Sequence, residues 1–165
     1  MSTIGFSYKD NVSNIPESSE MRFGIVVCEW NNNITYPLLE SITKTLIENG
    51  TKETNITIKE VPGCFELIYG CAQMIKYGFV DAIIAIGCVI KGDTPHFDYI
   101  CSGATQGLTI LNTTSNIPVI NGILTVNNLA QAEERIGLNN SQTDKGKEFA
   151  LTAIKMVDYA WQIQK

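Results

Sequence analysis

The chain has 165 residues, which is the length of one globular domain. Its composition of 44% hydrophobic and 18% charged residues supplies enough apolar material for a core and excludes a disordered chain. The formal net charge of −5 argues against a nucleic-acid or anionic-lipid partner, because such a partner would require a basic stripe. No apolar run approaches the roughly 20 residues of a membrane span, and no basic start followed by an apolar stretch marks a signal peptide. We therefore expect a cytoplasmic protein.

The first predicted strand–helix unit follows a polar start. Residues 1–20 predict a flexible N-terminal arm, and residues 21–165 predict a single domain. Residues 23–28 form a short, continuously apolar run, which is typical of a strand covered on both faces. A helix then follows from its apolar spacing, with Pro37 in its first turn and Gly50 at its end.

Two further strand–helix units come next along the chain. Residues 55–61 alternate between apolar and polar as a strand does, and residues 65–77 predict a helix. Residues 82–87 are the clearest buried strand. A loop over 88–95 and a helix over 96–111 follow.

The last units complete the predicted fold. Residues 118–125 predict a fourth strand, 129–136 a helix, and 139–144 a polar loop. A final helix carries Ala150, Ile154, Val157 and Trp161 on one face. This alternation predicts the α/β class, as a three-layer α/β/α sandwich around a four-stranded, mostly parallel, flavodoxin-like sheet.

In open parallel sheets, ligands bind beyond the carboxyl ends of the strands. The segments at that edge are Glu29–Asn33, Pro62–Glu66, Cys88–His96 and the stretch around Asn121–Asn128. Function must be read from these segments, because the fold by itself does not define it.

The segment before the third predicted helix is the most informative. Thr94 is expected to be the N-cap of that helix and Pro95 its first residue. Free backbone N–H groups at a helix start bind anions, and the absence of a Walker glycine–lysine pattern favours one small phosphate. His96, the single histidine, lies beside that anion site, where it can transfer protons. The alternative is an ordinary polar residue at a helix start.

Three other side chains each have two possible roles. Arg135 either pairs with Glu133 and Glu134 or binds the same phosphate, from this chain or a neighbour. Trp30 either stacks on a planar ring or closes the rim of the core. Glu66 either stabilises a helix dipole or accepts hydrogen bonds from sugar hydroxyls.

The cysteines are odd in number and show no metal-ligand spacing. We expect buried thiols in a reducing compartment and no metal site. Cys64 and Cys88 have no basic partner beside them in the sequence, so core or wall positions are favoured over a nucleophilic role.

Taken together, these segments resemble the lumazine synthase family. The resemblance runs from Met21 to Trp161 and is carried by four motifs, Arg22 to Val26, Val61 to Glu66, Gly92 to Tyr99, and Lys145-Gly146. It implies a transferase of riboflavin biosynthesis without metal or redox cofactor. The implied reaction condenses 5-amino-6-(D-ribitylamino)uracil with 3,4-dihydroxy-2-butanone 4-phosphate to 6,7-dimethyl-8-ribityllumazine, through an imine, elimination of phosphate and a ring closure that releases water.

The resemblance also implies roles for individual residues. His96 is the implied proton shuttle, and Asp93, Thr94 and Arg135 are the implied phosphate partners. Trp30 would stack on the uracil ring, and Lys145 and Glu148 resemble the family's charged pair near the site. The substrate-binding residues that the resemblance implies are Trp30, Cys64, Phe65, Glu66, Cys88, Val89, Ile90, Asn121, Lys145 and Glu148.

Two features depart from the family pattern. Asn121 stands where the family usually places a phenylalanine against the substrate, which removes an apolar wall worth about 1–2 kcal/mol. Weaker substrate binding without loss of the chemistry is therefore expected. The loop over 138–144, which borders the expected assembly contacts, is slightly longer than in many relatives.

The resemblance implies a homo-oligomer as well. Family members form pentamers, often packed twelve together into hollow icosahedral shells, with active sites between neighbouring subunits. The arm 1–20 would then lie along a neighbour, and riboflavin synthase is a further candidate partner.

The competing interpretations are a flavodoxin-like flavin carrier, which would have no use for His96 and Arg135, and a shell or scaffold protein with little activity. A third interpretation, a nucleotide-binding signalling domain, fails because it would need a phosphoacceptor aspartate at the end of the first strand, and the sequence has none there.

Overall fold

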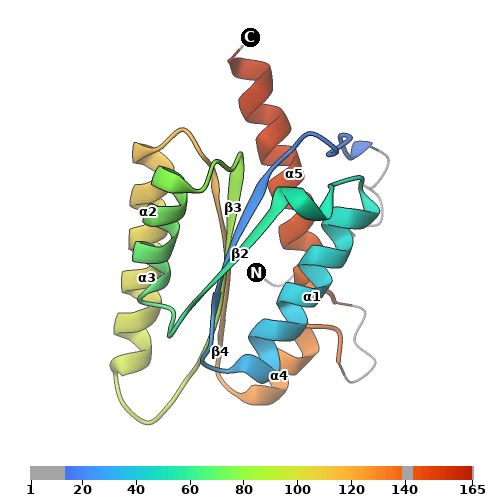
Figure 1. The fold of residues 1–165 in the computed structure, drawn as a ribbon. Coiled ribbons are helices and arrows are strands. Elements are labelled where there is room, and N and C mark those ends of the chain that lie inside the picture. The colour runs from blue at the N-terminus through green and yellow to red at the C-terminus, as the bar shows by residue number, and fades with distance from the viewer. Residues whose placement is uncertain (1–13, 139–142, 165) are drawn as a thin grey trace.

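The computed structural model describes residues 14–138 and 143–164. Its four strands form one parallel sheet in the order β2-β1-β3-β4, with β1 at Phe23–Cys28, β2 at Ile56–Val61, β3 at Ala82–Ile90 and β4 at Val119–Val126. The helices α2 (Leu67–Tyr77) and α3 (His96–Thr114) cover one face. The other face carries α1 (Asn32–Glu48), α4 (Leu129–Arg135) and α5 (Lys145–Ile163), and Figure 1 shows the three layers. The predicted α/β/α sandwich is confirmed, and its sheet is parallel throughout.

The core consists of two clusters, one on each face of the sheet. Side chains alternate along β1, so Phe23, Ile25 and Val27 pack against α1 and α5. Val26 and Cys28 pack on the opposite side against α2. All six residues of β1 are buried, as expected for a strand covered on both faces.

The predicted start of α1 and the predicted N-cap of α3 are wrong, the N-cap by one residue, whereas α3 begins at His96 as predicted. The helix α1 begins at Asn32, so Pro37 lies in its second turn instead of its first, where it removes one backbone hydrogen bond. Asn31 in a left-handed conformation (φ 56°) starts the helix early, and its carbonyl accepts from the N–H of Ile34 and Thr35. The N-cap of α3 is Pro95 instead of Thr94, because the Pro95 carbonyl accepts the first helical bonds, from Asp98 and Tyr99.

Other element boundaries also differ from the prediction by a few residues. The strand β3 continues to Ile90, three residues beyond the prediction, because β4 pairs with it over that stretch. The helix α2 starts at Leu67, and a 3₁₀ turn, η2 (Glu53–Asn55), precedes β2. Gly50 follows the end of α1 with φ 101°, and its N–H bonds to the carbonyl of Ile47, as a helix-terminating glycine does.

The segments before β1 and before α5 are partly described. Ser18 is buried, and its hydroxyl bonds to the Asn49 carbonyl at 2.8 Å and to the Thr51 hydroxyl at 2.7 Å. Residues 1–13 lie outside the described part, so the flexible arm over 1–20 stays a prediction. Residues 139–142 of the predicted loop are also outside it. The Asp144 side chain caps α5 by accepting from the N–H of Lys147.

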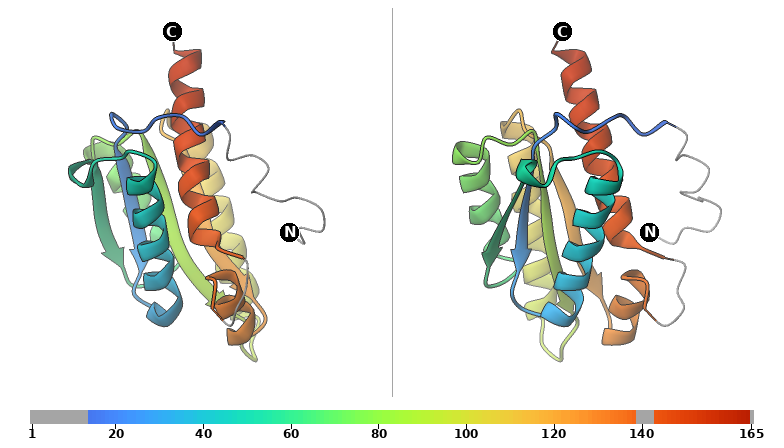
Figure 2. Two further views of the ribbon diagram at one scale, coloured as in Figure 1. Left: turned by 90° about the vertical axis from the view of Figure 1, so that its right-hand side faces the viewer. Right: turned by 45° about the vertical axis from the view of Figure 1, so that its right-hand side comes forward.

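All four strands end at the same edge of the sheet, which is the lower edge in Figure 1. The chain runs from that edge into α1, α2, α3 and α4, so the turns that precede these helices are neighbours. At the opposite edge, α5 extends past the sheet, as both views of Figure 2 show. Within the described residues, no helix combines the length and apolarity needed to cross a bilayer.

Candidate active site

A cavity of ≈ 410 Å³ lies at the carboxyl ends of β1 and β3, within the size range of small-molecule sites. Ten described residues line it: Trp30, Asn31, Cys64, Phe65, Glu66, Cys88, Val89, Ile90, His96 and Ile100. Eight of the ten were predicted as site residues from the sequence, and Asn31 and Ile100 were not. The lining is apolar apart from a few polar groups, which is the usual composition of a site that fixes the orientation of an organic ligand.

The turn after β1 places Trp30 on the wall of this cavity. Its N–H bonds to the Pro62 carbonyl at 3.1 Å, and the N–H of Glu29 bonds to the Val61 carbonyl at 2.9 Å. The indole lies directly against Gly63, where a Cβ would come within 2.6 Å of the ring. A side chain at position 63 would therefore displace the indole from this position. The side chain of Trp30 remains 65% exposed, with a free face for a ligand.

The turn between β2 and α2 supplies Phe65 and Glu66. Glu66 is the N-cap of α2, and its carboxylate makes no capping hydrogen bond there. It lines the cavity and is exposed, so both sequence-based interpretations, a favourable charge at a helix start and an acceptor for hydroxyls, fit its position. The ring of Phe65 approaches Gly103 of α3, where a Cβ would lie 3.3 Å away.

The end of β3 and the start of α3 complete the cavity. Val89 and Ile90 are half-buried on the extended part of β3 that the sequence placed in a loop. His96 is the first residue of α3, and it is exposed and faces the cavity. Ile100 lines the cavity one helical turn further on, so the i, i+4 spacing from His96 was the available signal for it.

The thiols differ in their environments. Burial raises the pKa of Cys88 to about 12 and that of Cys71 to about 12, which makes both poor nucleophiles at neutral pH. Cys64 differs, because a hydrogen bond from the Cys28 thiol lowers the pKa of Cys64. The predicted wall and core positions are confirmed, since Cys28, Cys64, Cys71 and Cys88 are buried and Cys101 is half-buried.

Several predicted site residues do not line this cavity. Asp93 and Thr94 are exposed in the loop directly before His96. Asn121 lies within β4, in register with Ala85, so it is not at the carboxyl edge where the sequence interpretation placed it. Its side chain is exposed on the free edge strand, and its Oδ1 accepts from the N–H of Ile123 at 3.1 Å.

The remaining predicted residues lie on α4 and α5, across the sheet from α3. The Arg135 guanidinium donates to the Gln131 carbonyl at 2.7 Å. Lys145 and Glu148 form an ion pair of 2.6 Å at the start of α5, so the predicted charged pair is present as a contact. None of the three lines the cavity that contains His96.

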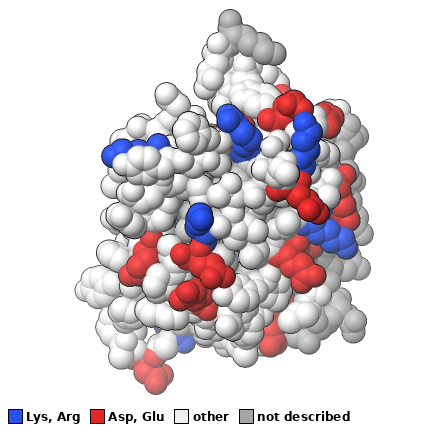
Figure 3. Space-filling view, in the orientation of Figure 1, with Lys and Arg blue, Asp and Glu red and all other residues white. Residues whose placement is uncertain are grey.

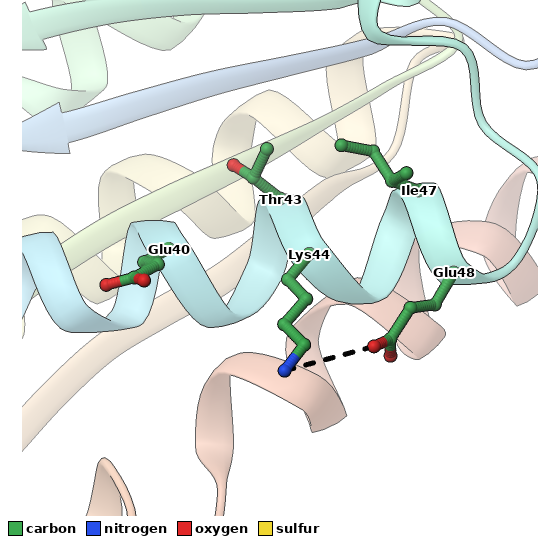
Figure 4. Close-up of a pocket in the computed structure, with 5 residues that line it drawn as sticks. All are labelled: Glu40, Thr43, Lys44, Ile47 and Glu48. Carbon is green, nitrogen blue, oxygen red and sulfur yellow. Dashed lines mark ion pairs between the residues drawn. The ribbon is translucent and has the colours of Figure 1, made fainter.

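Other surface features are less suited to binding. A hollow of ≈ 440 Å³ on α1 is lined, among the described residues, by Glu40, Thr43, Lys44, Ile47 and Glu48. Figure 4 shows that these come from one helix, with Lys44 directed toward Glu48 at 4.0 Å. Among residues 14–138 and 143–164, no second element supplies converging groups there. On the face seen in Figure 3, basic side chains are scattered among acidic ones.

An apolar cavity with a few polar groups, at the carboxyl edge of a parallel sheet between helices, defines an α/β protein that binds a small organic molecule. The model of the 6,7-dimethyl-8-ribityllumazine synthase family matches residues 20–160, and the chain belongs to that family. It is 56% identical over 153 residues to the 6,7-dimethyl-8-ribityllumazine synthase of Phocaeicola vulgatus, covering 93% of this chain and 90% of the relative. The protein of that name from Bacteroides fragilis is 57% identical over 145 residues, covering 88% of this chain and all of the relative.

Proposed function

We propose that this protein condenses 5-amino-6-(D-ribitylamino)uracil with 3,4-dihydroxy-2-butanone 4-phosphate to give 6,7-dimethyl-8-ribityllumazine, as the names of its relatives indicate. The observation that carries the proposal is the cavity itself, which brings together eight residues that the family resemblance assigns to the site. The proposed reaction uses no metal or redox cofactor. Imine formation and ring closure each release water, and phosphate leaves by elimination.

The lining residues suit the pyrimidine substrate. The exposed indole face of Trp30 stacks on the uracil ring. The free carboxylate of Glu66 accepts hydrogen bonds from ribityl hydroxyls. Phe65, Val89 and Ile90 supply apolar contacts that exclude water from the reacting atoms.

His96 is the proposed proton shuttle. It lines the cavity at the start of α3 and is the only histidine of the chain. An imidazole at that place can take a proton from the attacking amine and return one to a leaving oxygen. The loop residues Asp93 and Thr94 and the free N–H groups at the helix start bind the phosphate beside it.

Part of the proposed site comes from a second subunit. Arg135, Asn121, Lys145 and Glu148 do not line the cavity that holds His96, although the family resemblance assigns them to the same site. Arg135 lies on α4 across the sheet from α3, and Asn121 lies on the free edge of β4. A neighbouring copy that presents β4, α4 and the start of α5 to this cavity completes the set.

This arrangement supports sites between subunits, and the family resemblance implies that five copies assemble into a homopentamer. We further propose that the arm 1–20 lies along a neighbouring copy, that the enzyme is cytoplasmic and that riboflavin synthase is a candidate partner. The pentamers either remain free or pack twelve together into an icosahedral capsid. Native mass measurement distinguishes five copies from sixty.

The function is tested by mixing the purified protein with both substrates and following lumazine absorbance and phosphate release. Wild-type protein is expected to form product and phosphate in equal amounts, and His96→Ala to be slower by about 10²–10⁴-fold. Asp98→Asn, on the same turn of α3 but outside the cavity lining, is the control and is expected to retain full turnover. No product above the uncatalysed condensation would overturn the proposal and favour a scaffold, and an unaffected His96→Ala variant would remove the shuttle role.

A further inference from the structure

Two cysteine thiols from different parts of the chain are in contact beneath the cavity. The Sγ atoms of Cys28 and Cys64 lie 3.8 Å apart, although 36 positions separate the two residues. Cys28 is the last residue of β1 and is fully buried, whereas Cys64 lies in the turn after β2, lines the cavity and is 6% exposed. The proposed condensation uses no thiol chemistry, so it does not explain this contact.

Gly87 of β3 makes room for the pair. A Cβ at position 87 would come within 2.5 Å of the Cys64 Sγ and 3.3 Å of the Cys28 Sγ. The two sulfur atoms therefore lie side by side over a part of β3 that has no side chain. The N–H of Glu29 and the Val61 carbonyl, bonded at 2.9 Å, hold the two backbone segments together directly beside the pair.

The pKa values of the two thiols are shifted in opposite directions. The Cys28 thiol donates a hydrogen bond to the Cys64 sulfur, and the backbone at Cys88 also hydrogen-bonds to that sulfur, so the pKa of Cys64 is lowered. The same contact, together with burial, raises the pKa of Cys28. A thiol that lines a cavity, has a lowered pKa and lies beside a second thiol shares these features with cysteines that sense oxidants.

We propose that Cys64 and Cys28 form a reversible intrachain disulfide when a peroxide reaches the cavity. The Cys64 thiolate attacks one peroxide oxygen, the O–O bond breaks, and the departing hydroxide takes up a proton to become water. The Cys28 sulfur then attacks the resulting sulfenic acid, the S–O bond breaks, and the hydroxyl leaves as water with the Cys28 proton. Two thiols are oxidised to one disulfide, and one peroxide is reduced to two waters.

Bond formation alters the cavity. The sulfur atoms must close from 3.8 Å to about 2.05 Å, so at least one of the two side chains rotates or its backbone segment moves. The strand β1 is paired with β2 on one side and β3 on the other, so the movement falls on the turn that carries Cys64, Phe65 and Glu66. The effect of this movement on turnover rests on the proposed function, whereas formation of the disulfide does not.

The test treats the full-length wild-type protein with hydrogen peroxide and maps its peptides by mass without reduction. The expected result is a Cys28–Cys64 cross-link, loss of two of the five thiols, and full recovery with dithiothreitol. In Cys28→Ala no cross-link forms, and dimedone traps the sulfenic acid at Cys64. In Cys64→Ala the four remaining thiols survive the same treatment. Cys71→Ala, which removes a buried thiol outside the pair, cross-links as the wild type does.

Retention of all five thiols, or a cross-link through any other pair of cysteines, would overturn the proposal. The oxidised wild type is also expected to show shifted Trp30 emission and about 10–100-fold slower turnover, both reversed by reductant. A disulfide with unchanged emission and turnover would overturn the effect on the cavity. A disulfide in a protein whose untreated form makes no lumazine would instead overturn the proposed function and leave the thiol chemistry supported.

Discussion

The side chain of Asn31 connects the turn after β1 to the end of β3, because its Nδ2 donates to the Cys88 carbonyl at 2.9 Å. Pairing between β1 and β3 stops at Val27 and Ile86. The Asn31 amide therefore supplies a hydrogen bond to the Cys88 carbonyl, at a position of β3 that β1 no longer pairs with. Asn31 also has φ 56° and ψ 44°, a left-handed conformation that asparagine tolerates better than most residues. The residue that follows Trp30 is thereby fixed to the end of β3.

Substitution of Asn31 is expected to separate these two contributions. Asn31→Gly removes only the hydrogen bond and is expected to lower the free energy of unfolding by about 1 kcal/mol. Asn31→Ala also introduces left-handed strain and is expected to cost about 2 kcal/mol in total. Urea unfolding monitored by tryptophan fluorescence measures both. Equal losses of unfolding free energy in the two variants would show that strain contributes nothing. An Asn31→Gly variant with the unfolding free energy of the wild type would show that the hydrogen bond contributes nothing.

Most of the fold could be predicted from the sequence, because its signals are local. Apolar runs such as residues 23–28 and 82–87 identify strands buried on both faces, and the spacing of Ala150, Ile154 and Val157 identifies the inner face of α5. The end of β3 could not be predicted, since it depends on pairing with β4. The start of α1 could not be predicted either, because it depends on the backbone conformation of Asn31.

The site was predictable to the extent that its residues lie between the end of a strand and the first turn of the next helix. Trp30, Glu66 and His96 all do so, and all line the cavity. Asn31 was missed because its role is a long-range hydrogen bond, which no spacing in the sequence indicates. The contact between Cys28 and Cys64 was missed for the same reason, because it depends on how the end of β1 and the turn after β2 pack over Gly87.

Complementation between inactive variants tests whether sites are shared. His96→Ala and Arg135→Ala are each expected to be impaired alone. If one site takes His96 from one subunit and Arg135 from its neighbour, mixed oligomers assembled from equal amounts regain intact sites at about one quarter of positions. Product formation is measured after the variants are unfolded and refolded together. Each variant refolded alone is the control, and a mixture no more active than their average would place both residues in the same subunit's site.

Asn121→Phe is expected to strengthen substrate binding. The side chain of Asn121 is exposed on the edge strand β4, so a phenylalanine fits there without disturbing the core of this subunit. The restored apolar wall is worth about 1–2 kcal/mol, which corresponds to a ~5–30-fold lower Kd. Calorimetric titration with the pyrimidine substrate measures the change, and Asn121→Ala is the control for loss of the amide alone. Unchanged affinity would show that position 121 does not face the ligand.

Alkylation of Cys64 is expected to depend on pH in a way that reports its contact with Cys28. A lowered pKa means that the thiolate is present at lower pH, so the iodoacetamide rate at Cys64 should rise with a midpoint below the 9.0 of an ordinary thiol. Cys71 and Cys88, each with a pKa of about 12, should remain unmodified through that range. Mass mapping after short exposures measures each site separately.

Cys28→Ala removes the donating thiol, so the midpoint at Cys64 should move to higher pH. The other ionisable groups near that sulfur are Glu66, whose charge opposes the lowering, Cys88 and Cys101, while His96 lines the same cavity. The variant leaves all four in place, so the shift measures the thiol–thiol contact alone. A midpoint at or above 9.0 in the wild type, or one that the variant does not move, would contradict the assignment of Cys64 as the reactive member of the pair.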